Sequence, residues 1–164
     1  MKAFMDDNFL LDSPAAQKLY HEYAAGTPII DFHSHLPPEQ VAQDLRFDSL
    51  TKLWLGGDHY KWRAMRSNGE PEELVTGKGA DADKFAAWAA TMRSTIGNPL
   101  FHWTHLELRR YFGIQEVLGP KTAASILKQA NEQLKKPEFS VRGLLKQMNV
   151  RLLATTDDPA DDLA

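Results

Sequence analysis

Two short apolar segments, far apart along the chain, limit what it can fold into more than any other feature. Residues 29–32 and 150–155 are apolar runs bounded by turn-forming residues, which is typical of strands. Two short strands are marginally stable by themselves, and a parallel pair leaves both outer edges unpaired. We therefore predict buried strands that open a larger α/β protein. The chain has 164 residues, fewer than the roughly 250 residues of a complete (β/α)8 barrel.

The rest of the chain has mainly helical patterns. Asp58 is predicted to cap a helix that begins at His59, and Ser13 to cap a helix that Gly26 ends. Residues 67–82 are predicted to be a polar connector, because glycines interrupt a stretch with few apolar residues. Further helical segments are predicted at 39–45, 85–96, 101–112, 123–134 and 141–148.

His33 and His35 directly follow the first predicted strand. Side chains two residues apart on a strand point to the same face, so we expect the two imidazoles side by side at its carboxyl end. Active sites lie at that end of the strands in α/β barrels, and neutral imidazoles are good zinc ligands. A catalytic zinc site normally takes three protein ligands and a water, so the pair alone is incomplete. The alternative is a pair of solvated loop histidines.

A second group of candidates lies in the stretch Asp-His-Tyr-Lys-Trp-Arg at residues 58–63. The hydroxyl of Tyr60 can act as a general acid or base, and Lys61 or Arg63 could bind a carboxylate. The alternative is an amphipathic helix whose aromatic residues pack and whose basic residues are solvated. Spacing alone favours this second interpretation.

Other polar residues give weaker signals. His102 and His105 are three residues apart on a predicted helix, but His105 falls within an apolar stripe. A packed histidine with one hydrogen bond is therefore the better interpretation of His105. His21 is predicted to lie at the surface. Asp157 and Asp158 follow the second strand, where they could either reach a site or cap a following helix.

The composition argues against several classes of partner and site. The net charge is -3 and the basic residues are not clustered, so neither nucleic acid nor an anionic membrane surface is expected as a partner. The chain has no cysteine, which excludes disulfides and thiolate-ligated metals. Without an N-terminal apolar segment or a membrane-spanning run, we expect a cytoplasmic protein. A homo-oligomer is left open.

Four stretches of the chain, 4–11, 30–36, 58–66 and 155–159, carry a family resemblance. Together they resemble the uronate isomerases, the glucuronate/galacturonate isomerases of the amidohydrolase superfamily. The His-x-His at the end of the first strand is shared by the superfamily, whereas Asp-His-Tyr-Lys-Trp-Arg is particular to this family. The similarity extends over essentially the whole chain.

The resemblance implies an α/β fold, namely the N-terminal part of a distorted (β/α)8 (TIM) barrel of the metal-dependent hydrolase type. Within residues 1–164 it implies a mostly helical structure with two short strands and a helical insertion at about 37–148. The implied reaction is the aldose–ketose isomerisation of hexuronates in uronate catabolism. It converts D-glucuronate to D-fructuronate and D-galacturonate to D-tagaturonate.

The resemblance also implies roles for individual residues. His33 and His35 would be ligands of one divalent metal, for which zinc is expected. Tyr60 would transfer protons, while His59 and Arg63 would contact the small-molecule hexuronate. The family's further ligand, an aspartate near the last barrel strand, would lie beyond this chain. We therefore expect the chain alone to be inactive.

Two other functions compete with the isomerase interpretation. Another metal-dependent hydrolase of the superfamily would share the His-x-His pair but would lack the Asp-His-Tyr-Lys-Trp-Arg stretch. A non-catalytic helical module would bind a partner through exposed apolar surface, with the edge of residues 150–155 as the natural contact.

Overall fold

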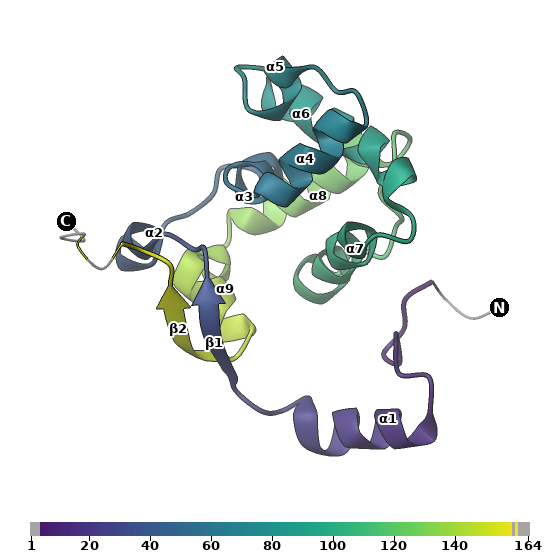
Figure 1. The fold of residues 1–164 in the computed structure, drawn as a ribbon, viewed down its shortest axis with the longest axis vertical. Coiled ribbons are helices and arrows are strands. Elements are labelled where there is room, and N and C mark those ends of the chain that lie inside the picture. The colour runs from purple at the N-terminus through teal and green to yellow at the C-terminus, as the bar shows by residue number, and fades with distance from the viewer. Residues whose placement is uncertain (1–3, 159, 161–164) are drawn as a thin grey trace. The chain divides into compact units, whose positions relative to one another are not determined.

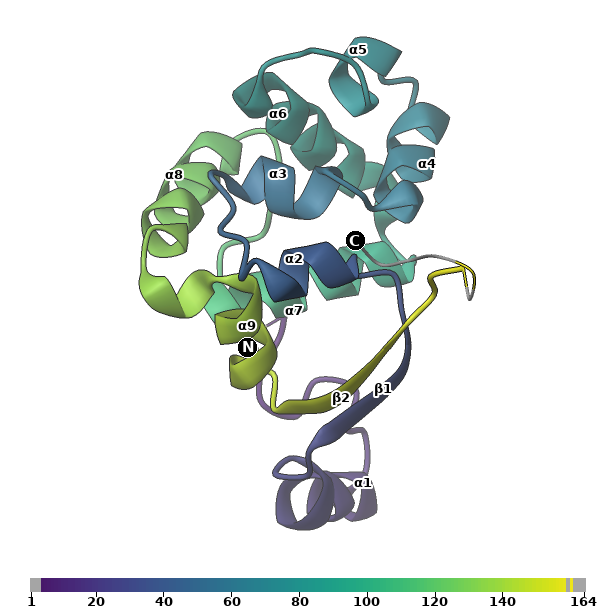
Figure 2. The same ribbon diagram turned by 90° about the vertical axis from the view of Figure 1, so that its left-hand side faces the viewer.

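The computed structural model describes residues 4–158 and 160 and divides the chain into two compact units. The strand unit comprises Met1–Arg46 and Glu138–Ala164, and the helical unit comprises Phe47–Pro137. Figure 1 and Figure 2 show their helices and strands from two directions. The predicted helical insertion at about 37–148 is wider than the helical unit, because its first and last helices group with the strands.

The strand unit is built around two parallel strands. β1 (Ile29–Ser34) and β2 (Val150–Thr155) pair with Ile29 opposite Val150, and the register shifts twice along the ladder. Figure 1 shows the strands side by side with both arrowheads at the same end. Both predicted strands are confirmed, and β1 runs two residues further than expected, so that it includes His33.

The strands are not buried as the sequence had suggested. Phe32 is 85% exposed, Ile30 56% and Leu152 51%. β2 packs against α9 (Val141–Gln147), but these three side chains meet no covering layer within the described part of the strand unit. The strands are therefore exposed in this chain, because burial of a two-stranded sheet requires elements packed on its faces, and their burial in a larger α/β protein stays a prediction.

The N-terminal helix begins as the sequence predicts. α1 (Pro14–Lys18) follows Ser13, whose Oγ accepts a hydrogen bond from the Ala16 backbone N–H at 3.1 Å. It continues as a π-helical segment, η1 (Leu19–Ala24), and ends shortly before Gly26. The predicted stop is confirmed to within two residues.

Arg142 holds α9 to α2 (Pro38–Ala42), the short helix that follows β1. Its backbone N–H donates to Asp44 Oδ1 at 2.9 Å, and its Nε donates to the Val41 carbonyl at 2.7 Å. The hydrogen bond from the Arg142 backbone is the main reason that the pKa of Asp44 lies below its usual value.

The helical unit packs its helices around an apolar core, and the core residues Leu50, Met65, Phe85, Trp88, Met92, Leu108 and Ile126 are completely buried. Figure 2 shows α3 lying among α4, α6 and α8. The elements are α3 (Leu50–Leu55), α4 (His59–Ser67), α5 (Glu72–Val75), α6 (Asp81–Thr91), η2 (Met92–Thr95), α7 (Pro99–Phe112) and α8 (Ala123–Leu134), and η3 (Pro137–Phe139) follows at the boundary.

Two details of the helical unit differ from expectation. The predicted connector at 67–82 contains the short helix α5. Ile96, the last residue of the helical segment predicted at 85–96 and an apolar residue, is 74% exposed. The reason is that α6 tightens into the 3-10 segment η2, and Ile96 then leaves the helix with ψ at 125°, so its side chain no longer follows the stripe. The helix predicted at 101–112 is confirmed, and it ends at Gly113, whose φ of 66° is left-handed.

None of the helices among the described residues has the length and apolar character needed to cross a membrane.

Candidate functional site

The first group of site residues lies at the carboxyl end of β1. The rings of His33 and His35 are side by side, with centroids 5.1 Å apart and planes at 83°. Both side chains are exposed. The backbone N–H of His33 donates to Asp31 Oδ1 at 3.3 Å, which helps to fix the chain where it leaves the strand. The predicted adjacency of the two imidazoles is confirmed.

The second strand brings a further group to the same place. Because β1 and β2 are parallel, with Ser34 opposite Thr155, the residues that follow both strands meet at one edge. Thr156 lies there, and its Oγ1 is 3.3 Å from Nδ1 of His35. A hydrogen bond to one ring nitrogen fixes the orientation of an imidazole and directs its other nitrogen to a ligand. Thr156 was not predicted as a site residue, although its position just after a strand was a usable signal.

The aspartates after β2 do not join this pair. Asp157 and Asp158 are exposed, and Asp158 Oδ1 accepts a hydrogen bond from the Ala160 backbone N–H at 2.9 Å. Within residues 4–158 and 160, no group of three or more histidine, aspartate or glutamate side chains is placed to hold a metal ion. His33 and His35 therefore supply a donor pair whose nitrogen chemistry suits zinc.

The second group of site residues lies in the helical unit, at the start of α4. His59 and Tyr60 are the first two residues of the helix, with ring centroids 4.4 Å apart. The Arg63 guanidinium carbon lies 5.7 Å from the centroid of the Tyr60 ring, one turn further along. Tyr60 is 56% exposed, so its hydroxyl is accessible from solution. These three residues are gathered on one helix, in a different unit from the histidine pair.

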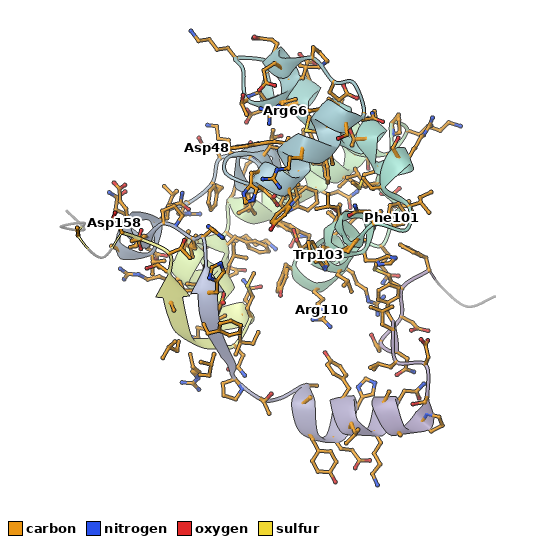
Figure 3. The ribbon with its side chains drawn as sticks, viewed as in Figure 1. Asp48, Arg66, Phe101, Trp103, Arg110 and Asp158 are labelled. Atoms are coloured by element: carbon orange, nitrogen blue, oxygen red, sulfur yellow. The ribbon has the colours of Figure 1, made fainter. Side chains whose placement is uncertain are left out.

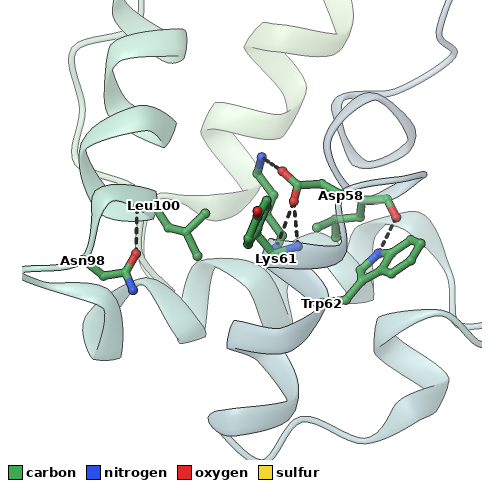
Figure 4. Close-up of polar contacts among 7 residues, drawn as sticks. Asp58, Lys61, Trp62, Asn98 and Leu100 are labelled. Carbon is green, nitrogen blue, oxygen red and sulfur yellow. Dashed lines mark hydrogen bonds and ion pairs between the residues drawn. The ribbon is translucent and has the colours of Figure 1, made fainter. Parts of the chain in front are cut away.

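The helix start that carries His59 and Tyr60 is fixed by its neighbours (Figure 4). Asp58 caps it as predicted, because Oδ1 accepts from the backbone N–H groups of Tyr60 at 2.9 Å and Lys61 at 3.1 Å. Trp62 Nε1 donates to the Leu55 carbonyl at 2.8 Å, which ties α4 to the end of α3. The side chains at the start of α4 therefore project from a rigid turn.

The position of Lys61 contradicts both interpretations of residues 58–63, in which Lys61 either binds a substrate carboxylate or is solvated. Its residue exposure is 6%, so it is neither part of a solvated basic face nor available to a substrate. Nζ is paired with Asp58 Oδ2 at 2.6 Å and lies 5.9 Å from the centroid of the Trp54 ring. The long aliphatic stem allows this burial, and the carboxylate compensates the charge. The lysine does bind a carboxylate, but it is the one that caps its own helix.

The pKa of Asp58 reflects this pairing. Burial raises it, but the hydrogen bond and charge of Lys61, together with the two backbone N–H groups, more than offset that effect and hold the pKa below its usual value. Asp58 is therefore ionised and can serve at once as helix cap and as ion-pair partner.

Glu107 on α7 is a half-buried carboxyl that was not predicted from the sequence. Burial raises its pKa, and the negative charge of Asp58 raises it further, whereas Lys61 and a hydrogen bond with Trp54 lower it. The net effect is a raised pKa. Glu107 precedes Leu108, a residue of the apolar stripe, and this was the available sign that Glu107 could be partly buried. Its contact with α4 could not be predicted, because it depends on the packing of two helices that are distant in sequence.

His105 is a structural residue of the helical unit. It is 5% exposed, its Nδ1 lies 2.6 Å from the Phe101 carbonyl, and its Nε2 accepts from the Leu118 backbone N–H at 2.9 Å. The expected packing is confirmed, with two hydrogen bonds in place of the one predicted. Since Nε2 accepts, the ring is neutral with its proton on Nδ1, and protonation would break the bond to Leu118.

This arrangement predicts an acid-sensitive helical unit. Burial is the main cause that lowers the pKa of His105 from 6.5, so the unfolded chain takes up a proton at a higher pH than the folded chain. The free energy of unfolding is therefore expected to fall as the pH decreases below about 6.5. Urea unfolding followed by tryptophan fluorescence at pH 7.5 and at pH 5.5 measures this change.

The matched variants for that measurement are His105→Gln and His102→Gln. The first should flatten the pH dependence over this range, although it lowers stability at both pH values. The second removes the partly exposed neighbour and should retain most of the dependence. An equal slope in His105→Gln and the unmodified chain would contradict the assignment.

Comparisons with known proteins show consistent similarity. The family model described as glucuronate isomerase matches residues 1–164. The uronate isomerases of Pectobacterium carotovorum and Phocaeicola vulgatus are 57% and 58% identical over 164 aligned positions, and each alignment covers 99% of this chain and 35% of the relative. The chain thus spans about a third of the length of these curated relatives.

Two solved structures resemble the fold. The uronate isomerase of Thermotoga maritima superposes with a TM-score of 0.92 at 34% identity, covering 99% of this chain and 35% of that one. The glucuronate isomerase of Caulobacter crescentus superposes with a TM-score of 0.85 at 24% identity, covering 98% and 36%. The second comparison supports the fold alone.

Proposed function

Because this chain belongs to the glucuronate isomerase family, we propose that the whole protein interconverts hexuronate aldoses and ketoses. The reactions are D-glucuronate to D-fructuronate and D-galacturonate to D-tagaturonate, and the proposed location is the cytoplasm. The observation that carries the proposal is the family match over all 164 residues. The geometry agrees with it, since two imidazoles stand together at the carboxyl end of parallel strands.

The proposed fold of the whole protein is a distorted (β/α)8 barrel that begins with β1 and β2. The exposed apolar side chains of Ile30, Phe32 and Leu152 support this, because further elements packed on the sheet would bury them. The unpaired edges of a two-stranded parallel sheet would likewise be used by neighbouring strands.

His33 and His35 would hold one divalent metal ion, with zinc proposed. When bound, such an ion polarises a carbonyl oxygen and stabilises negative charge that develops on it. Catalytic sites of this kind take three protein ligands, so the proposal includes a further ligand outside the described residues, an aspartate by the family resemblance. The contact of Thr156 with Nδ1 of His35 supports Nε2 as the nitrogen that binds the metal.

The residues at the start of α4 would act on the sugar acid. Moving the carbonyl from C1 to C2 requires removal of the C2 proton, delivery of a proton to C1 and proton movement between the two oxygens. The accessible Tyr60 hydroxyl is proposed for proton transfer. The Arg63 guanidinium can bind the C6 carboxylate with two parallel hydrogen bonds, and His59 can hydrogen-bond a sugar hydroxyl.

The function is tested by the isomerisation of D-glucuronate in the whole metal-loaded protein, with Tyr60→Phe as the informative variant. Loss of general acid–base catalysis is expected to lower kcat about a hundredfold with little change in KM. The phenyl ring keeps the contact with His59, so the fold should be retained. Tyr23→Phe is the control, because Tyr23 is an exposed tyrosine of the strand unit. Equal kcat values in the two variants would remove Tyr60 from the mechanism, and absence of turnover in the unmodified protein would overturn the proposed function.

A further inference from the structure

A pocket of about 610 Å³ lies within the helical unit, between α4, η2 and the start of α7. Its volume is in the range of small-molecule sites. We infer that this pocket binds a small polyhydroxylated monocarboxylate through Arg63, with Trp103 and Tyr60 as aromatic contacts and Asn98 and Ser67 as hydrogen-bonding groups.

The charge of the pocket selects for one negative group. Among the described residues that line the pocket, Arg63 alone carries a charge. Its guanidinium carbon lies over the Tyr60 ring, 5.7 Å from the centroid, and no carboxylate among the described residues forms an ion pair with it. Arg66, one turn along α4, differs because its guanidinium is already paired with Glu72. Nε of Arg66 donates to Oε2 of Glu72 at 2.7 Å, and Nη2 donates to Oε1 at 2.5 Å. Arg63 therefore has its guanidinium fork available for a ligand carboxylate.

Neutral polar groups stand around this charge. Asn98 Oδ1 accepts a hydrogen bond from the Leu100 backbone N–H at 2.9 Å, which assigns the carboxamide orientation and leaves Nδ2 as a donor (Figure 4). Ser67, the last residue of α4, adds a hydroxyl that can donate or accept. Groups of this kind match the hydroxyls of a sugar derivative.

Two large aromatic side chains on the pocket wall remain open to solvent. Trp103 is 53% exposed and Tyr60 56%, and Figure 3 labels Trp103 on α7. Rings of this size are usually buried by the fold, and exposed ones often mark binding sites. The C–H face of a sugar ring packs well against such a surface, while its edge hydroxyls reach the polar groups. A simple carboxylate without a ring would leave the aromatic surfaces uncovered.

The monoanionic and polyhydroxylated character of the ligand follows from the lining, whereas the choice of a hexuronate within that class rests on the proposed function. The pocket then adds Trp103, Asn98 and Ser67 to the residues that recognise the sugar acid.

The test is a titration of the ¹⁵N-labelled 164-residue chain, freed of metal with EDTA, followed by NMR. D-glucuronate is expected to shift the Trp103 indole signal and the amides of 60–67, 98 and 100–103 in a saturable manner. D-glucose, which lacks the carboxylate, and acetate, which lacks the hydroxyls, should each bind at least about tenfold more weakly. Equal affinity for acetate and D-glucuronate would overturn the role of the hydroxyls.

Arg63→Gln should weaken D-glucuronate binding by about tenfold or more. Arg93→Gln makes the same charge change at an exposed residue that does not line the pocket, and should leave affinity unchanged. Ser67→Phe, at another exposed position, should block the pocket without removing its charge. Unchanged affinity in either Arg63→Gln or Ser67→Phe, or shifts confined to residues around His33, would overturn the inference. Turnover is not measured in this experiment, so its failure is separate from a failure of the isomerase assay.

Discussion

Replacing His33 by alanine in the whole protein is expected to lower the turnover of D-glucuronate by about a thousandfold. The substitution removes one of the two imidazoles at the end of β1. The imidazole of His35, left alone at this edge, would hold a divalent ion much more weakly than the pair. A metal ion held there, as proposed, would contribute several kcal/mol to stabilising charge on the reacting oxygen, and each 1.36 kcal/mol corresponds to a tenfold change in rate. Zinc content per protein molecule should fall together with kcat.

The matched control for this prediction is His21→Ala. His21 is an exposed histidine of the strand unit whose Nε2 lies 2.8 Å from Asn8 Oδ1. Its removal should change neither zinc content nor turnover. A His33→Ala protein that keeps its zinc and loses activity would show that the pair acts on the substrate and not through a metal. Retention of both would exclude His33 from the site.

Lys61→Met is expected to destabilise the helical unit by about 3 kcal/mol, the lower end of the range for breaking a buried ion pair. Methionine fills a similar volume, but the Asp58 carboxylate would keep its partly buried position without the ammonium group 2.6 Å away. The lower end is expected because the Asp58 side chain is 31% exposed and water can partly solvate it. All four tryptophans lie in the helical unit, so their fluorescence during urea unfolding reports on this unit.

The chain offers a matched comparison for this measurement. Lys52 pairs with Asp48 at the same distance, 2.6 Å, but both side chains are largely exposed, so Lys52→Met should have little effect. Adding Asp58→Asn to Lys61→Met should restore much of the lost stability, because asparagine caps a helix about as well as aspartate and carries no charge. Equal losses in Lys52→Met and Lys61→Met would show that burial does not strengthen the pair.

The two kinds of site residue differ in how far the sequence could predict them. The adjacency of His33 and His35 follows from the two-residue repeat of a strand, and the cap at Asp58 follows from the chemistry of a helix start. Both depend on residues next to one another in the chain. Thr156 and Glu107 were missed because their contacts, with His35 and with the Trp54–Lys61 region, join segments far apart in sequence.

The sequence by itself determined the local structure of this protein. The bounds of β2, the start of α1 after Ser13 and the left-handed stop at Gly113 are all set by apolar periodicity, capping side chains and the conformational freedom of glycine. These interactions act over a few residues, so they can be recognised in a linear pattern.

Only the tertiary structure decided which polar groups are buried and what they meet. Lys61 looks like any basic residue of an amphipathic helix, yet the packing of α4 places it against Trp54 and removes it from water. In the same way, Phe32 looks like a core residue of a strand, yet it is exposed because no described element of the strand unit covers it. Burial is a property of all the neighbours that a side chain acquires on folding, and those neighbours come from distant parts of the chain.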